Sequence, residues 1–199
     1  MRHSGTLAHG AVVSRLPDDW RFVIGPVALL IYQGRVQQLP HTKSCFVCGE
    51  ENPVGLRLRF EADGGLVKAR FVPRPEHAGF KSTVHGGVLS TLLDEIMVWS
   101  CAVATRQFSY CAELNVRFLR PAKPGEEITA TAEMTANRRN RIFEARGELR
   151  DSEGRLLTSA TGKFMPIATE FMLDMTGDFV GDPTPFIEAA RKRPPAPPA

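Results

Sequence analysis

Hydrophobic residues occur along this chain in two patterns, one continuous and one alternating with polar residues. The longest continuous pattern covers residues 88–104, where Asp94 and Glu95 are the only charged side chains. A His-Gly-Gly sequence precedes it. A segment this apolar predicts a helix that is buried on most sides. A carboxylate inside such a helix is unfavourable unless another group pairs with it or uses it.

The alternating pattern predicts strands before and after this helix. Glycine-containing turns separate some of them, at residues 63–65 and 151–154. In the strand that follows the helix, Ala112, Leu114, Val116 and Phe118 share one face. The predicted strands cover residues 56–60, 66–72, 108–119, 128–134, 141–149 and 156–165.

Two strands, one long helix and four further strands do not alternate in the manner of a parallel α/β fold. The order predicts an α+β fold, in which an antiparallel sheet wraps around one long apolar helix. We place this domain at residues 44–166. Residues 1–43 are interpreted as an N-terminal extension, and residues 167–199 as a C-terminal extension that ends in a disordered proline-rich tail.

Composition restricts the classes of function. With 199 residues, of which 43% are hydrophobic, the chain can form one well-filled domain. The net charge of +3 is spread along the chain and predicts no nucleic-acid partner. The apolar segments 22–32 and 88–104 are shorter than the ~20 residues of a spanning helix, so we expect no membrane span. No signal peptide is recognisable, and we expect a cytoplasmic protein.

The spacing of two cysteines raises the possibility of a metal site or a redox pair. Cys45 and Cys48 have the spacing of half a zinc site or of a redox pair, but a structural zinc site needs two more ligands. Neither Cys101 nor Cys111 has a matching spacing. We therefore expect reduced thiols, with no metal and no cofactor.

The start of the predicted helix is a candidate oxyanion site. Gly86 and Gly87 place backbone N–H groups at a helix N-terminus, where the donors lack partners within the helix and the helix dipole is positive. His85 is expected to contact a substrate or to support the loop. The alternative is that only glycine fits where the helix enters against the sheet.

Asp94 is the candidate catalytic carboxylate. It follows Gly86 by eight residues, which is ~12 Å along a helix, so the two cannot act on one carbonyl within a single chain. Antiparallel helices related by a two-fold axis would bring Asp94 of one chain to Gly86 of the other, which predicts a homodimer. The alternative is a purely structural buried acid. Glu95 lies about 100° around the helix and is expected to be structural or interfacial.

Four segments together resemble a known family. They are the His-Gly-Gly at 85–87 with Asp94, Leu-Asn-Val-Arg-Phe-Leu-Arg-Pro at 114–121, Ser-Ala-Thr-Gly-Lys-Phe-Met-Pro at 159–166, and Cys-Phe-Val-Cys-Gly-Glu-Glu-Asn-Pro-Val-Gly-Leu at 45–56. In these features residues 44–166 resemble the hotdog-fold acyl-CoA thioesterases of the PaaI/THEM-like group.

This resemblance implies a hotdog fold and active sites at a dimer interface. Asp94 would be the general base or nucleophile, the Gly86 N–H would polarise the thioester carbonyl, and His85 would support the loop or the substrate. Gly87 would contact the substrate. Cys111 stands where one family pattern has a Thr or Ser that positions water, and Gly79 stands where another has an Asn.

Coenzyme A also needs cationic contacts for its phosphates. The basic cluster Arg138, Arg139 and Arg141 is the candidate, and the alternative is a solvated hairpin.

We therefore predict a homodimer, or a dimer of dimers, that hydrolyses acyl-CoA. The rival hypothesis is a non-catalytic acyl-CoA-binding or regulatory protein of the same fold. A hotdog dehydratase is a third reading, for which we find no suitably placed His–carboxylate pair. The sequence contains no Gly-x-Ser-x-Gly elbow, the motif that would indicate a serine hydrolase.

Overall fold

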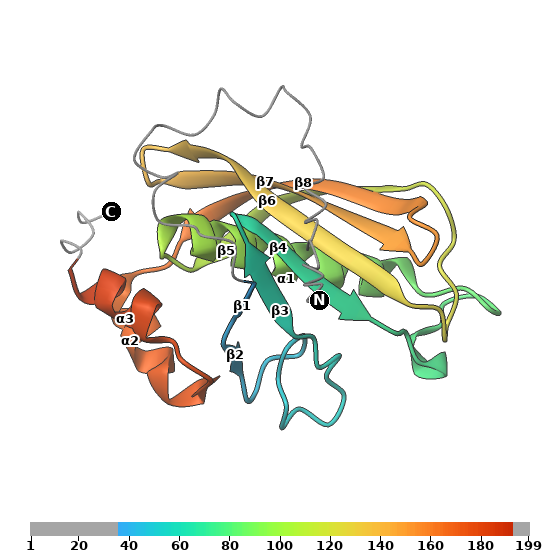
Figure 1. Ribbon diagram of the computed structural model, residues 1–199, viewed down its shortest axis with the longest axis horizontal. Coiled ribbons are helices and arrows are strands. Elements are labelled where there is room, and N and C mark those ends of the chain that lie inside the picture. Colours follow the sequence, from blue (N-terminus) through green and yellow to red (C-terminus); the bar gives the residue numbers. More distant parts are fainter. Residues whose placement is uncertain (1–35, 193–199) are drawn as a thin grey trace, which may run out of the picture. The chain divides into compact units, whose positions relative to one another are not determined.

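The computed structural model describes residues 36–192, and all elements named below lie within them. Seven strands form the main sheet in the order β1, β3, β4, β6, β7, β8, β5 (Figure 1). Each pair of neighbours is antiparallel. The strands are β1 Gln37–Gln38, β3 Phe60–Asp63, β4 Leu66–Phe71, β5 Ser109–Phe118, β6 Ile128–Arg138, β7 Ile142–Asp151 and β8 Leu156–Pro166.

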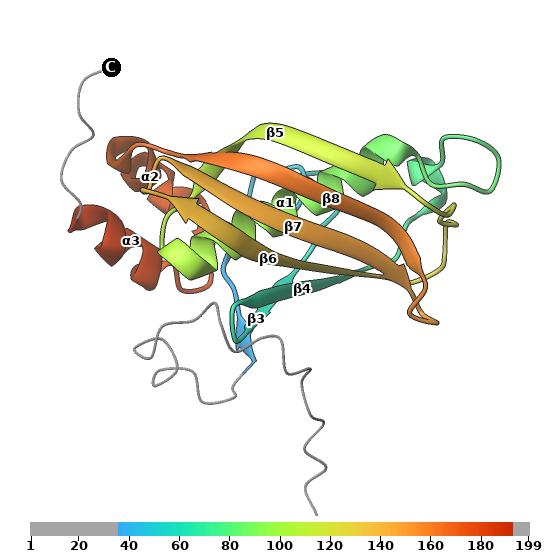
Figure 2. The same ribbon diagram turned by 90° about the horizontal axis from the view of Figure 1, so that it is seen from above.

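Helix α1, Gly86–Thr105, packs on one face of this sheet (Figure 2). Leu92, Leu93, Ile96 and Met97 are completely buried beneath the strands. Gly147 on β7 permits the close approach, because a Cβ atom there would lie 3.1 Å from Leu93. The helix begins two residues before and ends one residue after the predicted segment 88–104, so the expectation that it is too short to cross a membrane is wrong; by length and composition it could do so, yet here it forms the centre of the hydrophobic core.

Strand β5 ends the sheet and pairs only with β8 among the described strands. The register shifts between Cys111 and Glu113, which marks a β-bulge on this edge strand. Leu114 and Val116 are half-buried against the core, whereas Phe118 is 54% exposed. The alternation predicted for this strand therefore holds only over residues 113–117, because Ala112, at the bulge, and Phe118 are both exposed.

The segment after the sheet folds back on the far end of α1. It comprises α2 Thr169–Asp174, a short 3-10 helix η4 Met175–Asp178, β9 Phe179–Val180 and α3 Thr184–Arg191. Strand β9 pairs with β2, His41–Thr42, in a separate two-stranded sheet. The Phe186 ring packs with its centroid 5.1 Å from that of Phe108 and 6.0 Å from that of Trp99. These aromatic contacts attach the C-terminal segment to the core.

Most of the predicted elements are present. The helix and the four strands that follow it form as expected, and glycines with positive φ make two of the turns, Gly64 (57°) and Gly65 (96°) in one and Gly154 (79°) in the other. The prediction of a strand at residues 56–60 is wrong, because Arg57 has a φ of 59° and strand β3 begins only at Phe60.

The predicted N-terminal extension lies mostly outside the described residues, and so does the proline-rich tail at 193–199. Within residues 36–43, β1 pairs with β3 and so adds a strand to the main sheet. A 3-10 helix η3, Pro75–His77, lies in the segment that leads from β4 to α1.

Candidate active site

The first turn of α1 leaves one backbone donor available. His85 is the N-cap residue, and its Nδ1 accepts a hydrogen bond of 2.9 Å from the Gly87 N–H. Nδ1 can accept this hydrogen bond in the tautomer that carries its proton on Nε2. The Gly86 N–H makes no hydrogen bond to any residue in 36–192. Gly86, rather than Gly87, is thus the glycine that can donate to a ligand.

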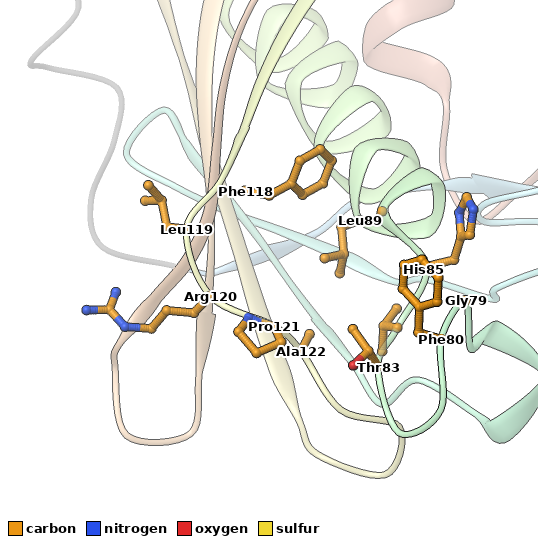
Figure 3. Close-up of a pocket in the computed structure, with 12 residues that line it drawn as sticks. Gly79, Phe80, Thr83, His85, Leu89, Phe118, Leu119, Arg120, Pro121 and Ala122 are labelled. Atoms are coloured by element: carbon orange, nitrogen blue, oxygen red, sulfur yellow. The ribbon is translucent and has the colours of Figure 1, made fainter.

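A cavity of about 570 Å³ opens at this end of the helix (Figure 3). Its wall is largely apolar, and a Cβ atom on Gly86 would lie 3.2 Å from the Phe118 ring, so only glycine fits there without displacing that ring. The cavity is lined by His85, Gly86 and Leu89 from the helix start, by Gly79, Phe80, Thr83 and Val84 before it, and by Phe118 at the end of β5 with residues 119–122 after it.

Asp94 lies in the middle of α1 and is only half-buried, unlike the fully buried Leu92 and Leu93. Its Oδ1 atom is buried and has no hydrogen-bond partner within the described residues. Burial raises the pKa of this carboxyl, and a hydrogen bond with the Cys111 thiol partly opposes that rise. A carboxylate with an unused oxygen and a raised pKa can act as a proton acceptor.

Cys111 stands on β5 beside the bulge, and it is the side chain that the structure brings to Asp94. Burial and then the hydrogen bond and negative charge of Asp94 raise the pKa of this thiol to about 12. Cys111 therefore keeps its proton at neutral pH and serves as a hydrogen-bond donor rather than as a thiolate nucleophile.

The hydroxyl groups near Asp94 in the sequence are occupied by the helix itself. Ser90 Oγ donates to the Gly86 carbonyl at 3.0 Å, and Thr91 Oγ1 donates to the Gly87 carbonyl at 2.9 Å. Neither is paired with a histidine, which agrees with the absence of a serine-hydrolase motif. Asp94 and Gly86 remain eight residues apart on one helix, so one chain does not bring them together.

The basic cluster lies at the β6–β7 turn and does not line the cavity. Arg138 donates two hydrogen bonds to Glu144, of 3.0 and 3.4 Å, and Arg139 adopts a positive φ in the turn. Arg141, like the other two, is exposed. Their predicted contact with phosphate stays a prediction.

A different cation, Arg120, stands at the rim of the cavity. Its guanidinium donates to the Leu156 carbonyl at 2.7 Å and points away from the apolar wall (Figure 3). Sequence reasoning missed this residue, although it lies in the segment 114–121 that carries the family resemblance. The signal available was its position directly before Pro121, where the edge strand has ended.

The opposite face of α1 holds a second cluster. Glu95 Oε1 lies 3.9 Å from Cys45 Sγ and accepts a hydrogen bond of 3.3 Å from Trp99 Nε1. Burial, and the nearby negative charge of Cys45, raise the pKa of Glu95 to about 8. Hydrogen bonds, chiefly with Cys48, lower the pKa of Cys45 to about 5, while that of Cys48 is raised by its hydrogen bond with Cys45 and by burial. The spacing in the sequence predicted that the two cysteines could act together, but it did not predict that Glu95 joins them.

Comparison with known proteins identifies the class. Residues 81–158 match the sequence profile of the thioesterase superfamily, a segment that includes α1 and β5 to β7. A solved structure described as a thioesterase superfamily protein superposes with a TM-score of 0.56 at 26% identity, over 62% of this chain and 63% of that one. Residues 81–158 therefore form a thioesterase superfamily domain, and the hotdog fold predicted for the chain is confirmed.

Individual relatives show which thioesterases this chain is similar to. Human acyl-coenzyme A thioesterase 13 is 26% identical over 108 residues, which cover 54% of this chain and 77% of the relative. The Escherichia coli PaaI protein shares the fold with a TM-score of 0.52 at 20% identity, over 56% of this chain and 80% of that one. Zebrafish thioesterase superfamily member 2 shares the fold with a TM-score of 0.54 at 21% identity, over 59% of this chain and 88% of that one. The match of residues 81–158 bears out the predicted thioesterase superfamily, and these relatives belong to the PaaI/THEM-like group that the sequence resembles. The roles of the individual site residues stay predictions.

Proposed function

We propose that this protein hydrolyses acyl-CoA thioesters to a free acid and coenzyme A, with Asp94 as general base. The observation that carries this proposal is the buried Asp94 Oδ1 without a partner among residues 36–192, on a carboxyl that faces the protonated Cys111 thiol. The matches to acyl-coenzyme A thioesterase 13 support the substrate class.

The chemistry needs a base and an oxyanion donor, and the residues supply both. Asp94 removes a proton from a water molecule, whose oxygen attacks the thioester carbonyl carbon. The Gly86 N–H donates a hydrogen bond to the oxygen that becomes negatively charged. The C–S bond then breaks, and the leaving sulfur takes the proton from Asp94. The Cys111 thiol holds the carboxylate in position by donating to it.

We propose that each site combines Asp94 of one chain with Gly86 of a second copy. Eight helical residues separate the two groups by ~12 Å, which exceeds the reach of one carbonyl. Strand β5 is a ten-residue edge strand, and on one side no strand among residues 36–192 pairs with its backbone groups. Its exposed Tyr110 and Phe118 side chains make this edge a natural surface for a second copy, since an open edge strand tends to pair.

A mixed dimer tests the base, the donor and the shared site together. One chain carries Asp94→Asn and the other carries Gly86→Pro, each with its own affinity tag, and the doubly tagged species is purified. Proline suits the first position of a helix and removes the N–H, and His85 (φ −61°, ψ 134°) already has the backbone conformation that a following proline requires. Thiol release from an acyl-CoA panel is the readout.

The mixed dimer has one site with both groups intact and one with neither, so we expect about half the wild-type rate. Each homodimer should be at least ~100-fold slower than wild type. Gly86→Ala is the matched control for the Phe118 contact, because it adds a Cβ but keeps the N–H. A mixed dimer as slow as the two homodimers would show that the site lies within one chain. Calorimetric binding of acyl-CoA without thiol release from wild type would support the binding-protein alternative instead.

A further inference from the structure

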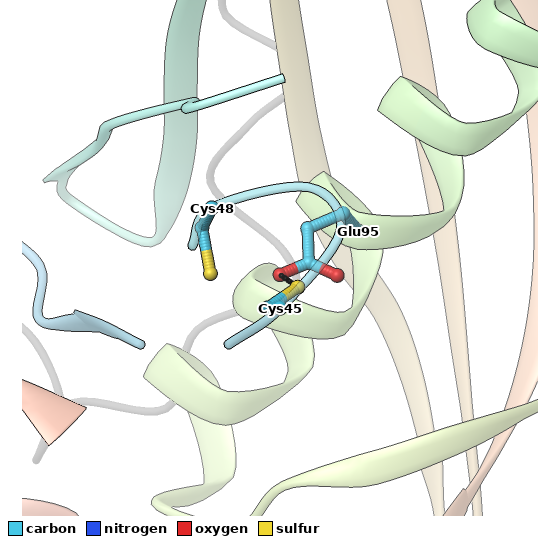
Figure 4. Close-up of side chains that lie close together, drawn as sticks. All are labelled: Cys45, Cys48 and Glu95. Atoms are coloured by element: carbon cyan, nitrogen blue, oxygen red, sulfur yellow. Dashed lines mark hydrogen bonds between the residues drawn. The ribbon is translucent and has the colours of Figure 1, made fainter. Parts of the chain in front are cut away.

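The loop before β3 brings two thiols to a carboxylate on the side of α1 that Asp94 does not occupy. The ligand atoms of Cys45, Cys48 and Glu95 all lie within 4.8 Å of one another (Figure 4). Cys48 is only 1% exposed. We propose that these three side chains bind a Zn²⁺ ion, with a water molecule as the fourth ligand.

The spacing of the three atoms suits this ion. Zinc binds thiolate sulfur at about 2.3 Å, so two tetrahedral thiolate ligands lie about 3.8 Å apart. Cys45 Sγ and Glu95 Oε1 are 3.9 Å apart, and no ligand pair exceeds 4.8 Å. A closure of less than about 1 Å therefore gives tetrahedral coordination around one ion.

The cysteine turn already has the form that a metal-bound thiolate needs. The Val47 N–H donates to Cys45 Sγ at 3.2 Å, and the Gly49 N–H donates to the Cys45 carbonyl at 2.9 Å. A Cβ atom on Gly49 would lie 2.2 Å from that carbonyl oxygen, so only glycine closes the turn. The Val47 N–H favours the charged sulfur and fixes its direction.

The surrounding residues orient the other two ligands. Trp99 Nε1 donates to Glu95 at 3.3 Å, and Trp99 itself is buried. Arg59 Nη1 donates to the Cys48 carbonyl at 2.9 Å, and the Thr42 hydroxyl lies 3.5 Å from Cys48 Sγ. Partners of this kind around a metal site hold its ligands in place before the ion arrives.

Charge gives an independent reason for a cation. Glu95 is a half-buried acid in an apolar helix, and no Lys, Arg or His among residues 36–192 forms an ion pair with it. Zn²⁺ binds both thiols and the carboxyl in their deprotonated forms, so any proton that these three groups carry is released to solvent. Two thiolates favour zinc over Mg²⁺ or Ca²⁺, which prefer oxygen ligands only.

The proposed ion would join the loop at Cys45 to the middle of α1, one residue from Asp94. Its ligands do not line the cavity, and its fourth position, held by water, stays open to exchange. Its presence does not depend on thioester hydrolysis, so the test below reads metal binding and not activity.

The test uses the full chain, purified with a thiol reductant and without chelator. Elemental analysis should find about one equivalent of zinc per chain. After removal of the metal under reductant, Co²⁺ should give the intense absorption of cobalt–thiolate coordination, and Zn²⁺ should abolish it. Cys48→Ser and Glu95→Gln should each lower the affinity for Zn²⁺ by at least ~10-fold. Cys101→Ser is the matched control, because Cys101 is a buried cysteine on the same helix outside the cluster.

A second measurement needs no variant. Zn²⁺ should protect Cys45 and Cys48, but not the exposed Cys111, from alkylation in the native protein, as peptide mass spectrometry would record. Wild-type protein without bound zinc and without a cobalt–thiolate spectrum would overturn the proposal. Equal zinc affinity in wild type, Cys48→Ser and Glu95→Gln would also overturn it, and equal loss in the Cys101→Ser control would place the ion elsewhere.

Discussion

Two neighbouring carboxylates on α1 have opposite surroundings. Asp94 faces the edge strand β5, keeps one oxygen without a partner among the described residues and meets a single thiol, Cys111. Glu95 faces the loop before β3 and meets two thiols and an indole N–H. Because successive helical residues point about 100° apart, one step along the chain separates a carboxylate available for chemistry from one enclosed by potential ligands. Sequence proximity therefore says little about shared function.

The largest expected effect separates the two acids directly. Asp94→Asn keeps the shape of the side chain but removes the base, so we expect kcat for acyl-CoA hydrolysis to fall about 1,000-fold. Glu95→Gln, its matched control on the other face, should change kcat by less than about threefold. Thiol release measures both, with thermal unfolding to show that each variant is folded. Equal losses in the two variants would remove the functional distinction.

The pH profile should report the same contrast. The pKa of Asp94 is raised by burial, so the carboxylate becomes protonated at a higher pH than a free aspartate does. As the pH falls through this raised pKa the base is lost, and kcat/KM should decrease about tenfold per pH unit below it. Initial rates of hydrolysis from pH 4 to pH 8 give the profile. A rate that stays constant down to the ordinary pKa of aspartate would argue against Asp94 as the base.

Cys111 gives a smaller test of the Asp94 face. Cys111→Ala removes the hydrogen-bond donor and should lower kcat about 3- to 10-fold. Cys111→Ser should restore or exceed the wild-type rate, because a hydroxyl is the stronger donor and acceptor. Steady-state kinetics on one acyl-CoA compare the three proteins. A complete loss in Cys111→Ser would instead indicate that the thiol itself reacts.

The smallest kinetic effect is expected on the Glu95 face. Trp99→Phe deletes the indole donor to Glu95 and part of a ring that packs on Phe60 and Phe108. We expect the free energy of unfolding to fall by about 1–3 kcal/mol while kcat stays within about twofold of wild type. Urea unfolding monitored by circular dichroism, together with thiol release, measures both. A large loss of kcat with unchanged stability would show that this face reaches the active site.

Local pattern predicted most of the fold because its physical causes are local. The long apolar segment gave α1, and Gly64 and Gly65 gave the turn that only residues tolerant of positive φ can make. The error at residues 56–60 is instructive. Leu56 and Leu58 are indeed both buried, but their N–H groups donate to Phe46 and Val47 in a loop rather than to a strand. Alternation predicted which side chains are buried, not which backbone they pair with.

The candidate site was predictable in part for the same reason. The spacing of His-Gly-Gly and Asp94 along one helix is a local property. It predicted the Gly86 N–H as the donor, and it predicted that Asp94 lies too far from this donor unless a second chain supplies one of the two groups. The meeting of Cys45 with Glu95 is not local, since 50 residues separate them and only the folded chain brings the loop to the helix. Arg120 was missed because its place at the cavity rim depends on where β5 ends.

The strongly apolar character of α1 has a consequence for how the chain is made. During synthesis this helix leaves the ribosome before β5, β6, β7 and β8, the four strands that later cover much of it. For that interval the cell meets an exposed segment that matches a membrane-spanning helix in length and hydropathy. Each acid near the centre of such a segment disfavours insertion by about 2.5–3.5 kcal/mol. Asp94 and Glu95 therefore lower the tendency of this segment to insert into a membrane before its strands cover it.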